Sequence, residues 1–255
     1  MENLSLQADH GEFLALAGLN GAGKSTFCYL LNALLLPSTG RVLSCGLDTS
    51  SKQNLSGIRR QVGLIMQNPD NQILAPTVED DVAFGPENLG LPREEIEIRV
   101  EEALEAMELT ALRRREPHLL SVGEKKRLAL AGVLATRPKV LVSDESTSML
   151  DPSTRAEVIR LFSWLQEEKG MTIIHATHRP EEMMAADRML LLSGGQILFD
   201  GKPERFFDGR ELVEREGFRP PVLLRLARAL EARGYNMPPN PMDTGKVVEQ
   251  LWPSS

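Results

Sequence analysis

The sequence has little of several residue types, and each shortage excludes a class of protein. Its 255 residues contain two cysteines, Cys28 and Cys45, which are too few for a disulfide framework and favour a reducing compartment. No apolar run approaches the ~20 residues that cross a bilayer, and no basic segment followed by an apolar one opens the chain. We therefore expect that a role at a membrane requires a partner that holds the chain there.

An excess of positive charge is also missing. Lysine and arginine number 29 against 36 aspartates and glutamates, which gives a formal net charge of -7. Such a chain has no overall basic field to attract nucleic acid, and we expect no nucleic-acid partner. Its length is sufficient for one large α/β domain with a small appendage.

What the sequence does contain is a glycine-rich stretch that fits the pattern G-x-x-x-x-G-K-S. It lies between an apolar run at 13–17 and a helical pattern at 27–36. Glycines let backbone N–H groups approach an anion closely, while Lys24 can reach the β- and γ-phosphates and Ser25 can ligate Mg²⁺. The alternative is a glycine-rich turn that matches by chance, and the flanking strand and helix argue against it. The predicted nucleotide-binding residues here are Gly18, Asn20, Gly21, Ala22, Gly23, Lys24, Ser25 and Thr26.

Short apolar runs alternate with helix-period stretches along most of the chain. This alternation predicts an α/β fold of the P-loop NTPase class, with a mostly parallel sheet flanked by helices. We expect an inserted helical subdomain at about 69–137, a hairpin through Gly194 and Gly195 that closes the sheet, and tail helices at 222–232 and 246–251. The apolar runs lie at 13–17, 62–66, 140–142, 171–175 and 189–192.

Two carboxylates, Asp144 and Glu145, follow the apolar run at 140–142, at the edge where open α/β sheets bind ligands. We predict that Asp144 holds Mg²⁺, directly or through water, and that Glu145 polarises the attacking water. The alternative is a solvated acidic pair at the end of a strand. A phosphate-binding loop upstream favours the catalytic interpretation.

A second anion site is predicted at 120–127, where a helix opens with a hydroxyl and free N–H groups in its first turn. The order of the phosphate loop, this segment, the paired carboxylates and a later histidine resembles the nucleotide-binding domain of ATP-binding cassette (ABC) proteins, up to about residue 208. The resemblance implies that Ser121 and Gly123 contact the γ-phosphate bound by a second ATPase subunit. The chain would then work as a homodimer or heterodimer with two shared ATP sites.

The same resemblance assigns roles to three further residues. Gln67 would sense Mg²⁺ and the attacking water, Asp151 would close the dimer seam, and His178 would contact the γ-phosphate. Each has an ordinary alternative, namely a solvated loop glutamine, an aspartate that caps a helix, and a hydrogen-bonded histidine after a strand. Their fixed order along the chain favours the functional interpretation.

A narrower resemblance lies in 67–73 and 75–86, which are similar to the ATPase subunits of energy-coupling factor (ECF) transporters, a group that includes cobalt and nickel importers. It implies a peripheral position on the cytoplasmic face of the cell membrane, with an integral membrane subunit that contacts 67–81. The acidic residues 79–81 would form a groove for arginines of that partner. The alternative is an acidic first turn of a helix, and the two are compatible.

Four residues depart from the pattern of these families. Val122 replaces a glycine and restricts the signature turn, Glu124 replaces a glutamine, Ser143 replaces an apolar strand residue, and Ser146 replaces a proline. The shared site that this signature contacts is therefore expected to be slow. No aromatic platform for adenine occurs in 1–12, so either more chain lies upstream or adenine is held without stacking.

The sequence thus predicts the ATP-binding and ATP-hydrolysing subunit of an ECF-type importer, with ATP and Mg²⁺ as cofactors. Its nucleotide-binding domain is expected at 1–208 and a C-terminal extension at 209–255. The cargo would be a transition metal, such as cobalt or nickel, or a vitamin. Two alternatives stay open: a degenerate, weakly hydrolysing partner of an active paralogue, and a non-transport ABC ATPase. The lack of a basic patch counts against the last.

Overall fold

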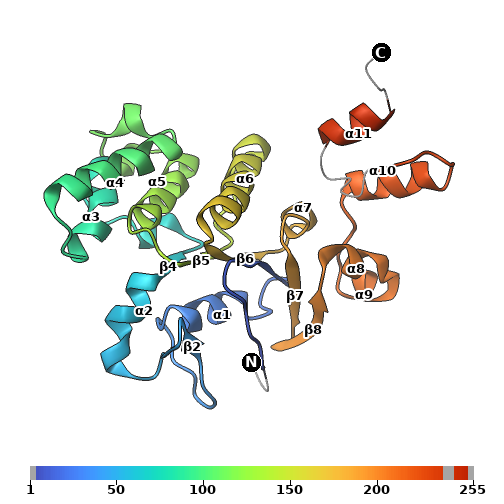
Figure 1. The fold of residues 1–255 in the computed structure, drawn as a ribbon, viewed down its shortest axis with the longest axis horizontal. Helices are drawn as coiled ribbons and strands as arrows, with labels where there is room; N and C mark the ends of the chain where they lie inside the picture. The colour runs from blue at the N-terminus through green and yellow to red at the C-terminus, as the bar shows by residue number, and fades with distance from the viewer. Residues whose placement is uncertain (1–3, 238–243, 252–255) are drawn as a thin grey trace.

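The computed structural model describes residues 4–237 and 244–251. Its strands are β1 Phe13–Ala17, β2 Leu43–Ser44, β3 Leu47–Asp48, β4 Val62–Ile65, β5 Val140–Asp144, β6 Thr172–Thr177, β7 Arg188–Ser193 and β8 Gln196–Gly201. Six of them form one sheet in the order β4-β5-β6-β1-β7-β8, in which every neighbouring pair is parallel except β7 with β8 (Figure 1). The predicted mostly parallel sheet and its closing hairpin are confirmed.

Helices connect these strands. The helices are α1 Lys24–Leu31, α2 Leu55–Gln61, α3 Val78–Asn88, α4 Arg93–Ala106, α5 Val122–Ala135, α6 Pro152–Lys169, α7 Pro180–Met183, α8 Pro203–Asp208, α9 Arg210–Arg215, α10 Val222–Glu231 and α11 Thr244–Leu251, with short 3₁₀ turns η1 Lys52–Asn54, η2 Pro69–Asn71, η3 Thr110–Leu112 and η4 Pro117–Leu119. None of these helices is long and apolar enough to cross a membrane, within the residues that the structure describes.

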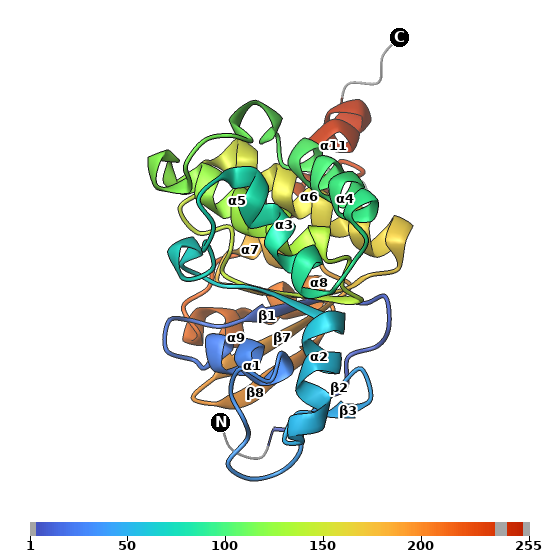
Figure 2. The same ribbon diagram turned by 90° about the vertical axis from the view of Figure 1, so that its left-hand side faces the viewer.

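Both faces of the sheet are covered, as Figure 2 shows, with α1 and α2 on one side and α5, α6 and α7 on the other. Leu14 and Leu16 of β1 pack with Phe27 on the first side, while Phe13 and Ala15 pack with Phe162 on the second. Alternate residues of a strand point to opposite faces, so a strand that is buried on both faces is apolar throughout. This arrangement leaves the carboxyl ends of the parallel strands free to carry polar side chains.

The segment predicted as a helical insertion contains helices alone among its regular elements, from η2 to α5, as expected. Its three long helices, α3, α4 and α5, pack against one another beside the β4 and β5 end of the sheet (Figure 1). Within it, the helix expected from the apolar spacing after Pro92 is α4. The insertion therefore lies next to the strands that carry the acidic residues.

The helix expected at 27–36 is shorter than predicted. It starts at Lys24 and ends at Leu31, because Ala33 turns the chain with φ 54 and the Asn32 side chain donates to the Val62 carbonyl at 2.5 Å. The leucines at 34–36 follow as exposed loop residues. Their apolar character extended the helical pattern beyond the point where the turn breaks it.

The C-terminal helices continue the packing of the core. The ring of Phe206 in α8 lies 5.4 Å from that of Phe199 in β8 and 5.7 Å from that of Phe218, measured between centroids. Val213 and Leu224 belong to the same apolar cluster. The division into 1–208 and 209–255 stays a prediction, and apolar contacts run across it. The expected tail helices correspond to α10 and α11, while residues 238–243 between them lie outside the described part.

Candidate functional site

The glycine-rich loop connects β1 to α1 at the carboxyl edge of the sheet. Gly21 and Gly23 have φ 81 and 104, a left-handed conformation that favours glycine. A Cβ on Gly18 would lie 2.5 Å from the Leu192 carbonyl oxygen, so β7 leaves no room for a side chain there. The N-terminus of α1 then presents backbone N–H groups, as a phosphate cradle requires. Of the other predicted loop residues, Asn20 and Thr26 are exposed and Ala22 is half-buried.

Lys24 is the buried cation of this loop. Its Nζ donates to the carbonyl of Gly18 at 2.8 Å and to that of Leu19 at 3.1 Å, and it pairs with Glu145 Oε1 at 2.9 Å. The ammonium therefore joins the loop to the predicted catalytic carboxylate. A terminal phosphate carries the same sign of charge as this carboxylate, so it would compete with Glu145 for Lys24.

Asp144 and Ser25 meet beside this lysine. Ser25 Oγ donates to Asp144 Oδ1 at 3.0 Å, while Asp144 Oδ2 is buried and has no hydrogen-bond partner among the described residues. Burial raises the pKa of Asp144; the Ser25 hydrogen bond lowers it and the charge of Glu145 raises it. A buried carboxylate oxygen with a free lone pair next to a hydroxyl matches the oxygen ligands that Mg²⁺ takes, with phosphates supplying the rest.

The remaining catalytic candidates lie around Glu145. Its Oε2 accepts a hydrogen bond from Gln67 Nε2 at 3.4 Å and lies 3.6 Å from His178 Nδ1. That histidine nitrogen is itself buried without a hydrogen-bond partner in the part of the chain described. The structure thus brings together Gln67, Glu145 and His178, which follow β4, β5 and β6.

The other predicted binding residues are not brought to this cluster. Ser121 is the exposed N-cap of α5, and it forms a capping box with Glu124: Ser121 N donates to the Glu124 carboxylate at 2.7 Å, and Glu124 N donates to Ser121 Oγ at 3.3 Å. Asp151 caps α6 in the same local way. Across the described residues, no hydrogen bond or ion pair joins Ser121, Gly123 or Asp151 to the phosphate loop. Val122 is the half-exposed first residue of α5.

The acidic groove expected at 79–81 is wrong for Asp81. Asp81 is buried, accepts the backbone N–H groups of Leu74 and Ala75 at 2.7 and 3.0 Å, and has a pKa that burial raises. Glu79 faces two arginines of its own chain at 3.5 and 3.6 Å. The alternative, an acidic first turn capped by Thr77, is confirmed. The pattern of charges in the sequence could not reveal that these carboxylates are already used.

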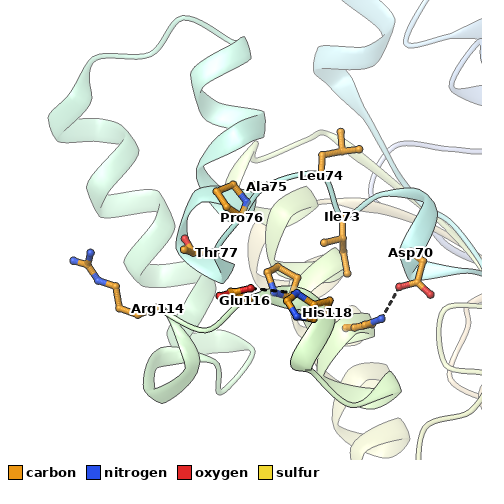
Figure 3. A pocket seen from close by; sticks show the side chains of 11 residues that line it. Asp70, Ile73, Leu74, Ala75, Pro76, Thr77, Arg114, Glu116 and His118 are labelled. Carbon is orange, nitrogen blue, oxygen red and sulfur yellow. Dashed lines mark hydrogen bonds and ion pairs between the residues drawn. The ribbon is translucent and has the colours of Figure 1, made fainter.

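A groove of about 660 Å³ lies beside this turn, between residues 70–77 and residues 114–118 (Figure 3). Lys125 closes one end through an ion pair with Asp70 at 2.7 Å, and His118 lies 3.4 Å from Glu116 within it. Leu74 is 68% exposed at its rim. In the sequence, the groove begins three residues after Gln67.

Lys126 is a residue that the sequence reasoning missed. It is buried in α5, and its Nζ lies 2.9 Å from Ser148 Oγ and 3.4 Å from the Glu145 carbonyl oxygen. Burial lowers its pKa to about 8. The sequence feature that could have predicted its burial is the helical spacing, because Lys126 lies four residues before Leu130, on the apolar side of α5. Through these two contacts, Lys126 connects α5 to the turn that follows β5.

A backbone cradle after β1, a lysine within it, and an acidic pair at the end of β5 define a P-loop nucleoside triphosphatase. Comparison with known proteins then gives the family. The model of the ABC transporter family matches residues 1–148. Curated relatives include the energy-coupling factor transporter ATP-binding protein EcfA1 of Symbiobacterium thermophilum, which is 47% identical over 98% of this chain and 88% of its own length. EcfA1 of Clostridium novyi is 44% identical over 98% and 90%.

Solved structures agree with this result. The structure of cbiO1 from Clostridium perfringens, part of the ABC transporter complex cbiONQ, has a TM-score of 0.75 at 36% identity and covers 91% of this chain and 90% of its own. A dimeric ATP-binding cassette bound to ADP and Pi has a TM-score of 0.71 at 29% identity, over 78% and 88%. The chain belongs to the ABC transporter family, in the group of energy-coupling factor ATP-binding proteins, and is an ATPase subunit of that type. The predicted family, fold and activity are confirmed.

Proposed function

We propose that this chain binds Mg-ATP at the 18–26 loop and hydrolyses it to drive an importer of the ECF type. The observation that carries the proposal is the contact of Lys24 with both the loop carbonyls and Glu145, which joins the phosphate cradle to the carboxylate. Backbone N–H groups and Lys24 bind the phosphates, and Ser25 and Asp144 hold Mg²⁺. When bound, this ion neutralises charge that develops on the transferred phosphoryl group.

Three side chains prepare the hydrolytic water. Glu145 accepts a hydrogen bond from the water and orients its lone pair toward the γ-phosphate. Gln67 donates a hydrogen bond to one carboxylate oxygen of Glu145, and His178, which lies beside the same oxygen, would donate to the γ-phosphate. Hydrolysis of this kind depends on positioning and charge stabilisation, which a cluster held from three strand ends supplies.

We propose that a second ATPase subunit, identical or related, completes each ATP site. Ser121 and Gly123 at the start of α5, with Asp151 at the start of α6, would face the phosphates bound by that subunit. Their support is the exposure of both helix starts and the dimeric state of the ADP-bound relative. Helix N-termini attract anions through their free N–H groups.

The integral membrane partner is proposed to dock in the groove at 70–77, at the cytoplasmic face of the membrane. The groove combines exposed apolar surface at Leu74 with a rim of charged side chains, which suits a helix end that carries both kinds of residue. Its link to catalysis is Gln67. We propose a transition metal such as cobalt or nickel, or a vitamin, as the cargo, on the resemblance of 67–86 to that group of importers.

Tagged full-length chain, expressed with the membrane genes of its own operon, tests this proposal. Leu74→Glu is expected to remove the chain from the membrane fraction while ATP binding is retained. Leu36→Glu is the matched control, since Leu36 is 56% exposed and does not line the groove. Membrane recovery and transport equal for the two variants would contradict the docking site, and a wild type without ATPase activity in the complex would contradict the hydrolytic role.

One observation favours a second candidate, a weakly hydrolysing partner of an active paralogue. The carboxylate of Glu124 accepts a hydrogen bond from the Ser121 N–H, at the helix start that we propose to face a γ-phosphate. A negative charge at this helix start also repels the nucleotide. Hydrolysis by the purified chain alone, compared with its mixture with the paralogue, separates the two candidates: turnover that appears only in the mixture favours the second.

A further inference from the structure

A chain of buried polar side chains runs behind the catalytic edge of the sheet. Ser146 Oγ lies 2.7 Å from Ser143 Oγ, which lies 2.9 Å from His175 Nδ1, and His175 Nε2 lies 2.9 Å from Glu182 Oε2. All four residues are at most 3% exposed. The order serine, histidine, carboxylate is that of a hydrolytic triad, but no substrate can reach a serine that is fully buried. These groups act on their neighbours instead.

Glu182 also anchors two threonines. Its carboxylate accepts hydrogen bonds from Thr147 Oγ1, at 2.9 Å, and from Thr177 Oγ1. Burial alone would raise the pKa of Glu182, but hydrogen bonds from His175 and the two threonines lower it to about 2. The network is thus fully hydrogen-bonded, and it joins β5, β6 and the start of α7 into one unit.

Three members of this network lie next to a catalytic candidate in the sequence. Ser143 precedes Asp144, Ser146 follows Glu145, and Thr177 precedes His178. The hydrogen bond between Ser143 and Ser146 closes a turn around both carboxylates, in which Glu145 has φ 48, a left-handed conformation that a residue with a side chain enters only when its surroundings hold it there.

We infer that Ser143, Ser146, His175 and Glu182 are positioning residues, which fix the Glu145 turn against the His178 loop for ATP hydrolysis. Two serines that depart from the family pattern, at 143 and 146, thereby gain a common role, since each is one partner of the same hydrogen bond. The inference rests on the proposed hydrolytic role of Glu145. It predicts a loss of turnover without a loss of ATP binding, because none of the four contacts the phosphate loop.

The test measures Mg-ATP hydrolysis by the full chain over a range of ATP concentrations for the wild type, Ser143→Ala and Ser146→Ala. The control is Ser44→Ala, since Ser44 is 5% exposed and donates to the Leu31 carbonyl far from the network. We expect kcat to fall about tenfold in the first two variants with KM within about twofold of the wild type. The double variant should fall no further than Ser143→Ala, because Ser146 reaches His175 through Ser143.

Wild-type kcat in both variants overturns the inference and leaves the hydrolytic role intact. So does an equal loss of kcat in Ser44→Ala, since removal of any buried hydroxyl would then have the same effect. If Ser143→Ala does not fold, Ser146→Ala, at the end of the network, tests the inference alone: kcat should fall while KM stays near the wild-type value. A wild type that binds ATP without hydrolysing it overturns the hydrolytic role, and this inference with it.

Discussion

Two halves of the predicted ATP site are built in different ways. The phosphate-binding half, residues 18–26 with Asp144 and Glu145, is held by contacts between distant parts of the chain, such as the Ser25 to Asp144 hydrogen bond across 119 positions. The signature half, residues 121–124 with Asp151, is held by contacts across two or three positions. The first half is assembled by the fold of one chain, whereas the second half is a pair of exposed helix starts, for which we propose a contact with a second subunit.

The largest effect on ATP binding should come from breaking the phosphate-binding half with Lys24→Ala. Loss of a charge-assisted contact that contributes about 1.5–3 kcal/mol should weaken ATP binding by at least about tenfold. Titration with a fluorescent ATP analogue measures it. Lys169→Ala is the control, because that lysine lies over the ring of Trp164 at the end of α6. Near-wild-type affinity for Lys24→Ala would disprove the cradle.

The largest effect on turnover should come from the change Glu145→Gln. Removing the group that orients water should lower turnover by about 10²–10³-fold, while bound ATP persists and holds two chains together. Steady-state hydrolysis and gel filtration with Mg-ATP measure the two effects. Glu204→Gln, an exposed glutamate in α8, provides the control. Full activity in Glu145→Gln would show that another residue prepares the water.

Asp144→Asn separates metal binding from folding. Burial raises the pKa of Asp144, so the folded chain holds this proton more tightly than the unfolded chain, and the ionised carboxylate opposes folding as pH rises through that pKa. Without nucleotide at pH 7, asparagine should therefore raise Tm by a few degrees, about 2–4 °C per kcal/mol, while Mg²⁺-dependent hydrolysis is lost. A thermal scan gives the first result, and a lower Tm would contradict it.

The smallest effect belongs to the signature half. Backbone and hydroxyl hydrogen bonds from Ser121 lower the pKa of Glu124, so this carboxylate is charged at neutral pH beside the predicted anion site. Glu124→Gln keeps a capping side chain without the charge and should raise turnover about two- to fivefold, the range of one helix-end charge. Glu94→Gln, in the first turn of α4, is the control. An unchanged rate would mean that Glu124 does not slow the site.

Local sequence patterns predicted most of the features that depend on residues close together in the chain. The phosphate loop, the alternation of strands and helices along the chain, and the helix starts at Ser121 and Asp151 follow from glycine geometry, apolar periodicity and capping preference. The end of α1 was predicted too late, because apolar loop leucines continued the helical spacing. The acidic groove was expected from the resemblance of 67–86 to ECF ATPase subunits, and the sequence did not reveal that Asp81 is buried.

The sequence alone determined that this chain carries a nucleotide cradle, because the glycine loop and its lysine are contiguous in the chain. It also indicated the family, through the order of this loop and the later motifs. Only the tertiary structure decided which side chains meet. The pairing of Lys24 with Glu145 and the network from Ser146 to Glu182 join segments far apart in the chain. Such contacts depend on strand order and packing, which no local pattern encodes.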